Sequence, residues 1–166
     1  NSDEIRSEIK KMSISQGHRG PDHNGFWQDN NVSFYLSHQR LSILDLSKLG
    51  NQPMISKSGR YVISFNGEIY NFRELKLKLE KNNPALKWLG SSDTEVLLAL
   101  IEENGLKNAL KKCVGMFALA LWDRKNKILQ LARDRIGEKP IYYGSTGNDL
   151  NQFFIFGSEI ASIKKF

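Results

Sequence analysis

The sequence contains a single cysteine, Cys113, and only three histidines among its 166 residues. One cysteine excludes an internal disulfide framework and is typical of a reducing compartment, so we expect a cytoplasmic protein. The cysteine and the histidines are not spaced as metal ligands, and we expect no metal site. Cys113 lies in an apolar approach to a buried strand, where a cysteine usually acts as a small hydrophobic residue and not as a nucleophile.

Long apolar runs are absent too. No stretch approaches the roughly 20 apolar residues that cross a bilayer, so a membrane is not an expected partner. The 24 lysines and arginines outnumber the 18 aspartates and glutamates and give a net charge of +6. Because no basic stripe is interleaved with aromatic residues, a solvated lysine-rich surface explains this charge better than a nucleic-acid-binding surface.

Glycine motifs that bind nucleotides or carry a catalytic serine are also missing. The sequence has no P-loop, no dinucleotide-binding glycine pattern and no nucleophile elbow. Its hydrophobic content of 40% and its charged content of 25% are ordinary for a soluble globular protein. A length of 166 residues is that of one domain, which we expect to cover residues 1–166.

What the sequence does contain is a series of short strands between grouped helices, which predicts an α+β fold with antiparallel sheets. The apolar spacing predicts helices at residues 2–16, from 71 onwards, at 92–105 and 106–112, and from about 158. Alternating or wholly apolar runs predict strands at residues 25–37, 61–65, 115–122, 128–133, 141–144 and 153–157.

Two of the predicted helices begin with the spacing of a capping box. Asn71 is followed three residues later by Glu74, and Ser92 is followed in the same way by Glu95. We therefore expect the side chains of Asn71 and Ser92 to accept hydrogen bonds from the first turns of these helices.

The run from Asn66 to Phe72 joins the strand at 61–65 to a helix start, with Gly67 at the joint. A backbone that turns sharply there presents N–H groups and a side-chain amide together, which is the chemistry of an oxyanion hole. From these residues alone, a plain strand-to-helix connector explains Gly67 better than an oxyanion hole does. In the same way, an ordinary surface role explains Arg40, and a favourable interaction with the helix dipole explains Asp93.

Several segments, in their order along nearly the whole chain, resemble one known family. It is the glutaminase domain of glutamine-hydrolysing asparagine synthetases, a class II glutamine amidotransferase with the N-terminal-nucleophile hydrolase fold. The resemblance implies a four-layer αββα sandwich of two antiparallel sheets. The segments that carry it are His18–Asp22, His38–Asp45, Gln52–Met54, Asn66–Phe72, Ser92–Glu95, Gly115–Ala118 with Trp122–Asp123, and Ala132–Arg135 with Gly137–Pro140.

The resemblance also implies a substrate site. Arg40 would hold the α-carboxylate of glutamine, because a guanidinium group matches two carboxylate oxygens. Asp93 would bind the substrate ammonium, and Glu68 would help to fix the same end. The side-chain amide of Asn66 and the backbone N–H of Gly67 would form the oxyanion hole. Four residues would line the pocket with their backbone: Leu41, Ser42, Ile43 and Leu44.

The reaction implied by the family is hydrolysis of the glutamine amide through a thioester. The nucleophile is an N-terminal cysteine whose own α-amino group is the general base. The ammonia then passes to a C-terminal synthetase domain that uses ATP and Mg²⁺ to amidate aspartate, while the glutaminase domain itself needs no cofactor. Glutamine and the synthetase domain are therefore the expected partners, and the resemblance leaves a homodimer open.

The printed chain departs from this family at its start. It begins with Asn1 inside the expected first helix, so the first strand and the N-terminal cysteine are missing from the printed residues. We expect both to precede Asn1 in a longer protein, and we expect the chain as printed not to hydrolyse glutamine. Cys113 cannot replace the nucleophile, because an internal cysteine has no free α-amine.

Two alternatives remain beside this interpretation. The chain could bind glutamine without hydrolysing it, or it could be the glutaminase domain of a relative that amidates another acceptor, such as a sugar. Other class II families, including glucosamine-6-phosphate synthase and amidophosphoribosyltransferase, resemble the chain only at Asn66 and Gly67, so we rank them below both.

Overall fold

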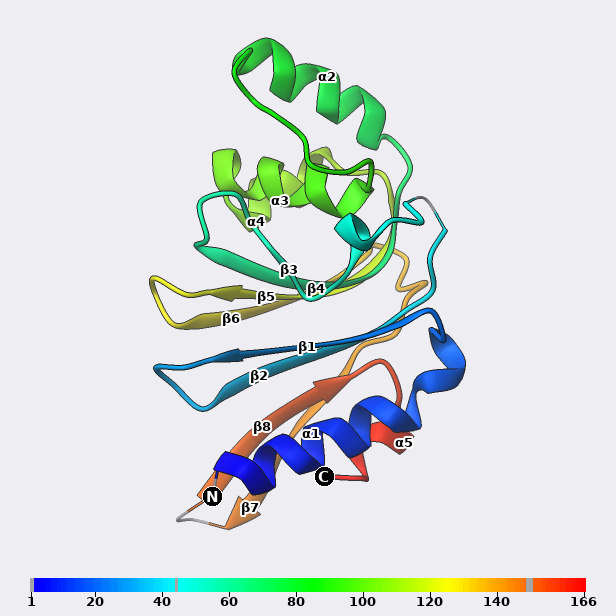
Figure 1. Ribbon diagram of the computed structural model, residues 1–166, viewed down its shortest axis with the longest axis vertical. Coiled ribbons are helices and arrows are strands. Elements are labelled where there is room, and N and C mark those ends of the chain that lie inside the picture. Colours follow the sequence, from blue (N-terminus) through cyan, green and yellow to red (C-terminus); the bar gives the residue numbers. More distant parts are fainter. Residues whose placement is uncertain (1, 44, 149–150) are drawn as a thin grey trace.

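Four layers of secondary structure stack on one another (Figure 1). The structure is a computed structural model that describes residues 2–43, 45–148 and 151–166. The first layer consists of α2 (Phe72–Asn82), α3 (Asp93–Asn104) and α4 (Leu106–Lys112). These helices cover an antiparallel sheet whose strands, in spatial order, are β3 (Met54–Ile55), β4 (Tyr61–Ile69), β5 (Gly115–Asp123) and β6 (Ile128–Arg133).

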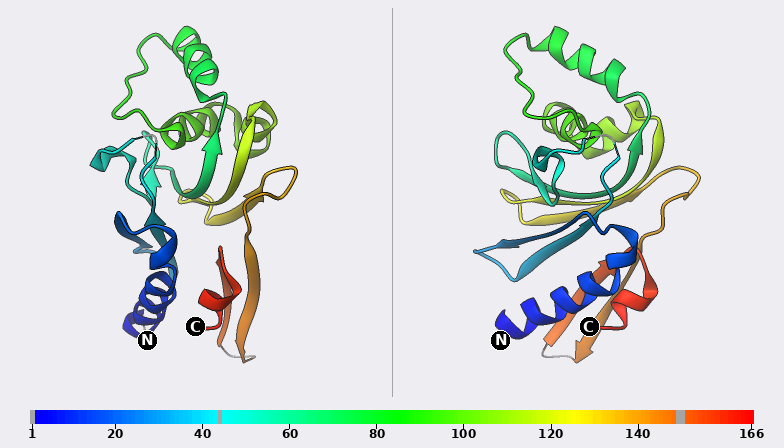
Figure 2. Two further views of the ribbon diagram at one scale, coloured as in Figure 1. Left: turned by 90° about the vertical axis from the view of Figure 1, so that its right-hand side faces the viewer. Right: turned by 45° about the vertical axis from the view of Figure 1, so that its right-hand side comes forward.

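Two hairpins and two further helices lie on the other face of this sheet. The hairpins are β1 (His23–Asp29) with β2 (Phe34–Arg40), and β7 (Tyr142–Asn148) with β8 (Asn151–Gly157). Helix α1 (Ser2–Ser15) packs against β2, and α5 (Ile160–Ile163) packs against α1 and β8 (Figure 2). Short 3-10 helices, η1 and η2, cover Gly17–Arg19 and Lys48–Gly50.

The layers confirm the predicted α+β sandwich of antiparallel sheets, with one difference in the second sheet. That layer consists of two separate two-stranded sheets among the residues that the structure describes, because β2 pairs only with β1 and β8 pairs only with β7. None of the described helices is both long and apolar enough to pass through a bilayer.

The larger core lies between the four-stranded sheet and the helices. Side chains alternate between the two faces of a strand, so odd-numbered residues of β4, such as Ile63 and Phe65, point toward α3. There they meet Leu97 and Ile101, which are fully buried. Strand β5 is buried over most of its length on both faces, as its nearly all-apolar sequence predicts.

A smaller core joins the same sheet to the hairpins. Val62 of β4, together with Ala120 and Trp122 of β5, packs against Leu36 of β2, and Phe156 of β8 also contacts this cluster. Both hairpins are thus attached to the four-stranded sheet through apolar side chains, although no ladder of hydrogen bonds joins β2 to β8.

The predicted capping box at the start of α3 is present in part. The Ser92 hydroxyl accepts a hydrogen bond from the Glu95 N–H at 3.2 Å. The Glu95 carboxylate accepts instead from the N–H groups of Leu89 at 2.7 Å and Gly90 at 2.9 Å. Glu95 therefore holds the preceding loop rather than the backbone N–H of Ser92.

The predicted side-chain cap at Asn71 is wrong. Asn71 is the N-cap residue of α2, but its side chain makes no capping hydrogen bond. Its amide donates to the Lys112 carbonyl at 3.0 Å and accepts from the Val114 N–H at 2.9 Å. Because Val114 lies directly before β5, the side chain joins the end of β4 to the start of β5.

Strand β4 is longer than the sequence predicts, and Gly67 lies inside it rather than at a turn. Gly67 does not have a positive φ angle. A Cβ at this position would overlap the carbonyl oxygen of Met116 and the Cα of Phe117 on β5. Glycine is therefore required by the close approach of two strands and not by a special backbone conformation.

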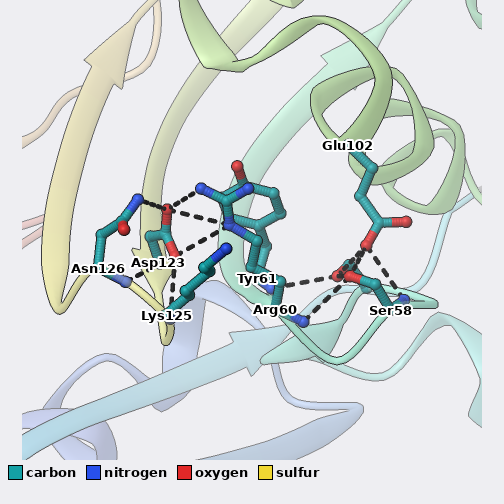
Figure 3. A network of polar contacts seen from close by, with 8 residues as sticks. Ser58, Arg60, Tyr61, Glu102, Asp123, Lys125 and Asn126 are labelled. Atoms are coloured by element: carbon teal, nitrogen blue, oxygen red, sulfur yellow. Dashed lines mark hydrogen bonds and ion pairs between the residues drawn. The ribbon is translucent and has the colours of Figure 1, made fainter.

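A polar network fixes the far end of β4 and β5 (Figure 3). The Arg60 guanidinium donates to Asp123 from Nη2 at 2.7 Å, and Asp123 also accepts from the N–H groups of Lys125 and Asn126. On the helical side of this network, the Glu102 carboxylate accepts from Ser56 Oγ at 2.6 Å. The turn between β3 and β4 and the turn between β5 and β6 are thereby held in place.

Candidate functional site

A cavity of about 610 Å³ lies between β4 and β5, the hairpin strands β2 and β8, and α1. Most of the site residues predicted from the sequence line this cavity: Arg40, Leu41, Ile43, Asn66, Gly67, Glu68 and Asp93. Ser42 does not, and its N–H donates to the Asp22 carboxylate at 2.7 Å. Leu44 lies outside the described residues. The structure thus brings together residues that are more than fifty positions apart in the sequence.

The space for the cavity comes from small side chains on β5. Asn66 is opposite Ala118 in the antiparallel register, and Ser64 is opposite Ala120. These four residues lie on the sheet face that points toward the hairpins. The short side chains of the two alanines leave space above that face. The polar side chains of β4 consequently face an open volume rather than a packed core.

Gly67 directs its backbone N–H away from β5. In an antiparallel pair, hydrogen-bonded residues alternate with residues that bond to the other side. Arg124 N donates to Arg60 O at 2.9 Å, and Tyr70 N donates to Val114 O at 2.8 Å. Even-numbered positions of β4 therefore bond to β5, and Gly67, at an odd-numbered position, points its N–H toward the opposite edge.

On that opposite edge, two side chains take the place of a neighbouring strand. The Phe65 N–H donates to Gln52 Oε1 at 2.6 Å, and the Phe65 carbonyl accepts from Gln52 Nε2 at 3.1 Å. Two residues beyond Gly67, the Ile69 N–H donates to the Asp93 carboxylate at 2.8 Å. Among the described residues, nothing accepts a hydrogen bond from the Gly67 N–H between these two anchors.

This free N–H lies next to the side-chain amide of Asn66, which also has no hydrogen-bond partner within the described part of the chain. Two donors at neighbouring positions can stabilise a negative oxygen between them, as an oxyanion hole requires. The signal in the sequence was the Asn66–Gly67 pair. The strand edge that leaves the N–H free depends on Gln52, which sequence reasoning did not select as a site residue.

Asp93 is the first residue of α3 and is only 5% exposed. Burial raises the pKa of its carboxyl group above the ordinary value, although hydrogen bonds from the backbone N–H groups of Ile69 and Thr94 oppose this shift. The nearby charge of Glu68 raises the pKa further. Two carboxyl groups in one cavity create a negative region that favours a cation such as an ammonium group.

Arg40 is buried and holds the loop that follows β2. Its Nη1 donates to the Ser47 carbonyl and to Asn51 Oδ1, both at 2.8 Å, and its Nη2 donates to the Asp45 carbonyl. Gly50 lies against the guanidinium group, where a Cβ would overlap Nη2. The Nε–H and one N–H on Nη2 have no partner within the described residues, so part of the guanidinium fork remains able to bind an anion.

The loop after β2 is also tied to the loop before α3. The Asp45 carboxylate accepts from the N–H groups of Ser47 at 2.8 Å and Ser91 at 2.9 Å. Hydrogen bonding from the Ser47 side chain, together with the backbone N–H groups of Ser91 and Ser47, lowers the pKa of Asp45 to about 2, although burial opposes this shift. The loop that follows Arg40 and the loop that precedes Asp93 are therefore connected through the Asp45 carboxylate.

His38 is a cavity residue to which the sequence assigned no role. Its Nδ1 lies 3.1 Å from Ser64 Oγ on β4. Burial lowers the pKa of His38 to about 4, and the charges of Arg40 and His23 add to this effect. The imidazole is therefore neutral near pH 7. The alternation of His38 with Arg40 along β2 is the pattern that could have identified it.

Cys113 lies outside the cavity. Its side chain is buried, its thiol donates to the Ala109 carbonyl at 3.3 Å, and burial raises its pKa to about 11. These features agree with the structural role that the sequence predicts. Among the described residues, no three histidine, cysteine, aspartate or glutamate side chains gather as a metal-ligand set.

The chain is thus an α+β sandwich whose cavity brings the Asn66 amide and the Gly67 backbone together with a buried arginine and two carboxyl groups. The family model described as a glutamine amidotransferase domain matches residues 1–166, and the chain belongs to that family.

Two curated relatives and one solved structure illustrate the similarity. The chain is 40% identical to "Asparagine synthetase [glutamine-hydrolyzing] 2" of Bacillus subtilis, over 93% of the chain and 19% of the relative. It is 41% identical to "Asparagine synthetase [glutamine-hydrolyzing] 2" of Oryza sativa, over 84% of the chain and 22% of the relative. It therefore spans about a fifth of the length of these relatives.

The fold is similar to that of a solved glutamine phosphoribosylpyrophosphate amidotransferase from Bacillus subtilis, with a TM-score of 0.62. The match covers 78% of this chain and 28% of that one, at 24% sequence identity. At this identity the similarity shows the fold, and it agrees with the sandwich described above.

Proposed function

We propose that residues 1–166 form the glutaminase domain of an asparagine-synthetase-like enzyme, which releases ammonia from glutamine for the ATP-dependent amidation of aspartate. One observation carries the proposal: within the residues that the structure describes, the Gly67 N–H is left free between the Gln52 and Asp93 anchors, beside the Asn66 amide. These donors and the charged groups of Arg40 and Asp93 line one cavity.

Glutamine fits this cavity with its two ends in opposite environments. The free N–H groups of Arg40 bind the α-carboxylate, and Asp93 with Glu68 binds the ammonium. Leu41 and Ile43 line the wall beside the amino-acid end. The amide carbonyl then lies at Asn66 and Gly67, where a donor is most useful when the oxygen becomes negative.

The nucleophile in this proposal is an N-terminal cysteine on a strand that precedes Asn1. Consecutive residues of β2 and β8 line the cavity, and these strands are not bonded to each other, so a strand between them would complete the second sheet. The α-amine, with an ordinary pKa of about 7.7–8.0, takes the proton of the thiol. The thiolate attacks the amide carbon, and the amine returns the proton to the departing ammonia.

Asn66 and Gly67 stabilise the tetrahedral oxyanion that forms in this attack, and stabilise it again when water hydrolyses the thioester to glutamate. Losing one such donor typically lowers kcat by about 10²–10³-fold. The domain needs no cofactor for these steps. ATP, Mg²⁺ and aspartate belong to a synthetase domain of the same cytoplasmic protein, and a homodimer is compatible with this arrangement.

The proposal is tested in the full-length gene product by measuring ammonia release from glutamine. Asn66→Ala should lower kcat by about 10²–10³-fold with little change in KM, because the donor acts mainly on the oxyanion. Arg40→Ala and Asp93→Ala should instead raise KM. An open reading frame without an N-terminal cysteine ahead of Asn1, or a full-length protein that releases no ammonia, would contradict the proposal.

Binding without hydrolysis is a second candidate, favoured by the position of Cys113 away from the cavity in the printed chain. It requires that the folded 166-residue protein bind glutamine at millimolar concentration, as measured by calorimetry, and lose binding in Arg40→Ala. The glutaminase site does not determine which acceptor receives the ammonia. A sugar acceptor would be identified by amidation of the sugar when the full-length protein is assayed without aspartate.

A further inference from the structure

Gln52 has a role that neither the fold nor the family description assigns. Its side chain is buried and lines the cavity, and its amide makes two hydrogen bonds to one residue, Phe65. A side-chain amide carries the same donor and acceptor as a peptide group. The Gln52 side chain can therefore replace one peptide group of a neighbouring strand and pair with the Phe65 backbone.

The position of this contact along β4 is specific. Strand β3 pairs with β4 only at Met54 with Ile63 and at Ile55 with Val62. The next residue of β4 that points to this edge is Phe65, and the residue after that is Gly67. The Gln52 side chain thus extends the hydrogen bonding along this edge of β4 from Ile63 to Phe65. The next N–H on the edge, that of Gly67, has no partner among the described residues.

Gln52 is itself held from the hairpin layer. A Cβ at Gly25 of β1 would overlap the Gln52 carbonyl oxygen, so the two backbones are in close contact. The amide of Gln52 consequently connects a fixed point on β1 to the Phe65 carbonyl. That carbonyl belongs to the same peptide group as the N–H of Asn66, and its orientation affects the direction of the Asn66 side chain.

We propose that Gln52 is a positioning residue for the two oxyanion donors. It holds the Phe65–Asn66 peptide group so that the Asn66 amide and the Gly67 N–H point at the same oxygen. The inference rests on the proposed glutaminase function, because its effect on activity is read through those donors.

The test is Gln52→Glu in the full-length protein. At neutral pH the carboxylate lacks the donor for the Phe65 carbonyl and repels it. We expect kcat for glutamine hydrolysis to fall about tenfold near pH 8, less than the 10²–10³-fold for loss of a donor, with an unchanged KM. Burial raises the pKa of such a carboxyl group, and its protonated form donates again. The ratio of variant to wild-type kcat should therefore rise as the pH is lowered toward 5.

Asn104→Asp is the matched control. The Asn104 amide also donates to a backbone carbonyl, that of Leu100, at 3.2 Å, but it lies outside the cavity. The same chemical change there should leave kcat and its pH dependence unchanged. Gln52→Met keeps a similar shape without hydrogen bonds, and it replaces Gln52→Glu as the test if that variant does not fold. It should lower kcat at every pH.

A Gln52→Glu enzyme with wild-type kcat across this pH range overturns the inference, as does a change in KM alone. Wild-type protein that releases no ammonia overturns the proposed function instead. In that case amide hydrogen exchange decides the inference, since Gln52→Glu must accelerate exchange at Ile69, four residues from its own contact, while Asn104→Asp must not. Faster exchange confined to Phe65 would show a purely local role.

Discussion

Gly67 has no side chain because the neighbouring strand leaves no room for one. A Cβ there would overlap backbone atoms of Met116 and Phe117, which cannot rotate away. Gly67→Ala should therefore lower the free energy of unfolding by about 1–3 kcal/mol or more, as overpacking in a rigid core does. Urea unfolding of the 166-residue protein measures the change.

Gly17→Ala is the control for that experiment. A Cβ at Gly17 meets nothing within 4 Å, so the substitution should have little effect. Equal stability of Gly67→Ala and the wild type would show that β4 and β5 can separate at this point, and that their close approach is not what requires a glycine.

Cys113 should resist thiol reagents in the folded protein. Its side chain is 1% exposed, and burial raises its pKa to about 11, so the reactive thiolate is scarce at neutral pH. Labelling with a chromogenic disulfide at pH 7.5 should be slow and should become rapid in denaturant. Complete labelling of the native protein within seconds would contradict the buried position.

Asp29 should stabilise the fold in a pH-dependent way. Burial opposes its ionisation, but hydrogen bonds from Trp122 Nε1 at 2.8 Å, the Asn31 N–H at 2.9 Å and Lys127 Nζ at 3.0 Å lower its pKa to about 2. A lowered pKa in the folded state means that the stabilisation is present above the unfolded pKa of about 3.9 and is lost as the pH falls toward 2.

Asp29→Asn should accordingly cost about 1–3 kcal/mol of unfolding free energy at pH 7, because buried donors lose a charged acceptor. The difference from the wild type should shrink between pH 4 and pH 2. Urea unfolding at both pH values measures it, and a difference that is constant with pH would exclude the charge of Asp29 as the cause.

At the scale of elements, β5 is anchored at its two ends by different aspartates. Asp123 accepts from Arg60 at one end, and at the other Asp134 accepts from the Phe117 N–H at 3.1 Å and from four consecutive N–H groups, those of residues 136–139. Although burial alone would raise it, these N–H groups hold the pKa of Asp134 well below its usual range. Asp134 replaces β6, which ends at Arg133, as the partner of Phe117.

Asp134→Asn should therefore accelerate amide hydrogen exchange at Phe117 and in residues 136–139, because a neutral amide accepts these bonds more weakly. Asp123→Asn is the matched control and should affect only the turn at residues 124–126. Exchange that rises evenly along β5 in either variant would contradict separate anchoring of its ends.

The elements that the sequence predicts best are those whose residues interact locally. The apolar spacing of residues 2–16 predicts α1 almost to its ends, and the Ser92 cap accepts its hydrogen bond from the first turn of the helix that follows it. The errors come from distant partners. Gly67 is read as a turn because its constraint is the carbonyl of Met116 on another strand, and Asn71 is read as a cap although its amide binds residues 112–114.

The candidate site shows the same division. Asn66, Gly67, Arg40 and Asp93 could be chosen from motifs, and the structure places all of them along one cavity. Gln52 could not be chosen in this way, because its role depends on which edge of β4 is left without a strand. The unpaired edge of β4 results from its short pairing with β3, and no short sequence segment predicts that pairing.

At the scale of the whole molecule, the second sheet is divided between β2 and β8. If the proposed N-terminal strand occupies this division, a protein that includes the residues preceding Asn1 should have a higher melting temperature than the 166-residue chain. Hydrogen exchange should slow in both β2 and β8. An extension of equal length and scrambled sequence is the control, and equal protection by both extensions would contradict the proposed strand.

The alternation along β4 has a consequence for substrate choice. The Gly67 N–H and the Ile69 N–H that anchors Asp93 point to the same edge, and neighbouring positions on one edge of a strand are about 7 Å apart, twice the rise per residue. Under the proposed function, this spacing separates the site of the substrate ammonium from the site of the amide oxygen. The spacing along β4 then sets the length of the substrate. Asparagine, which is shorter than glutamine by one methylene group, cannot reach both sites together.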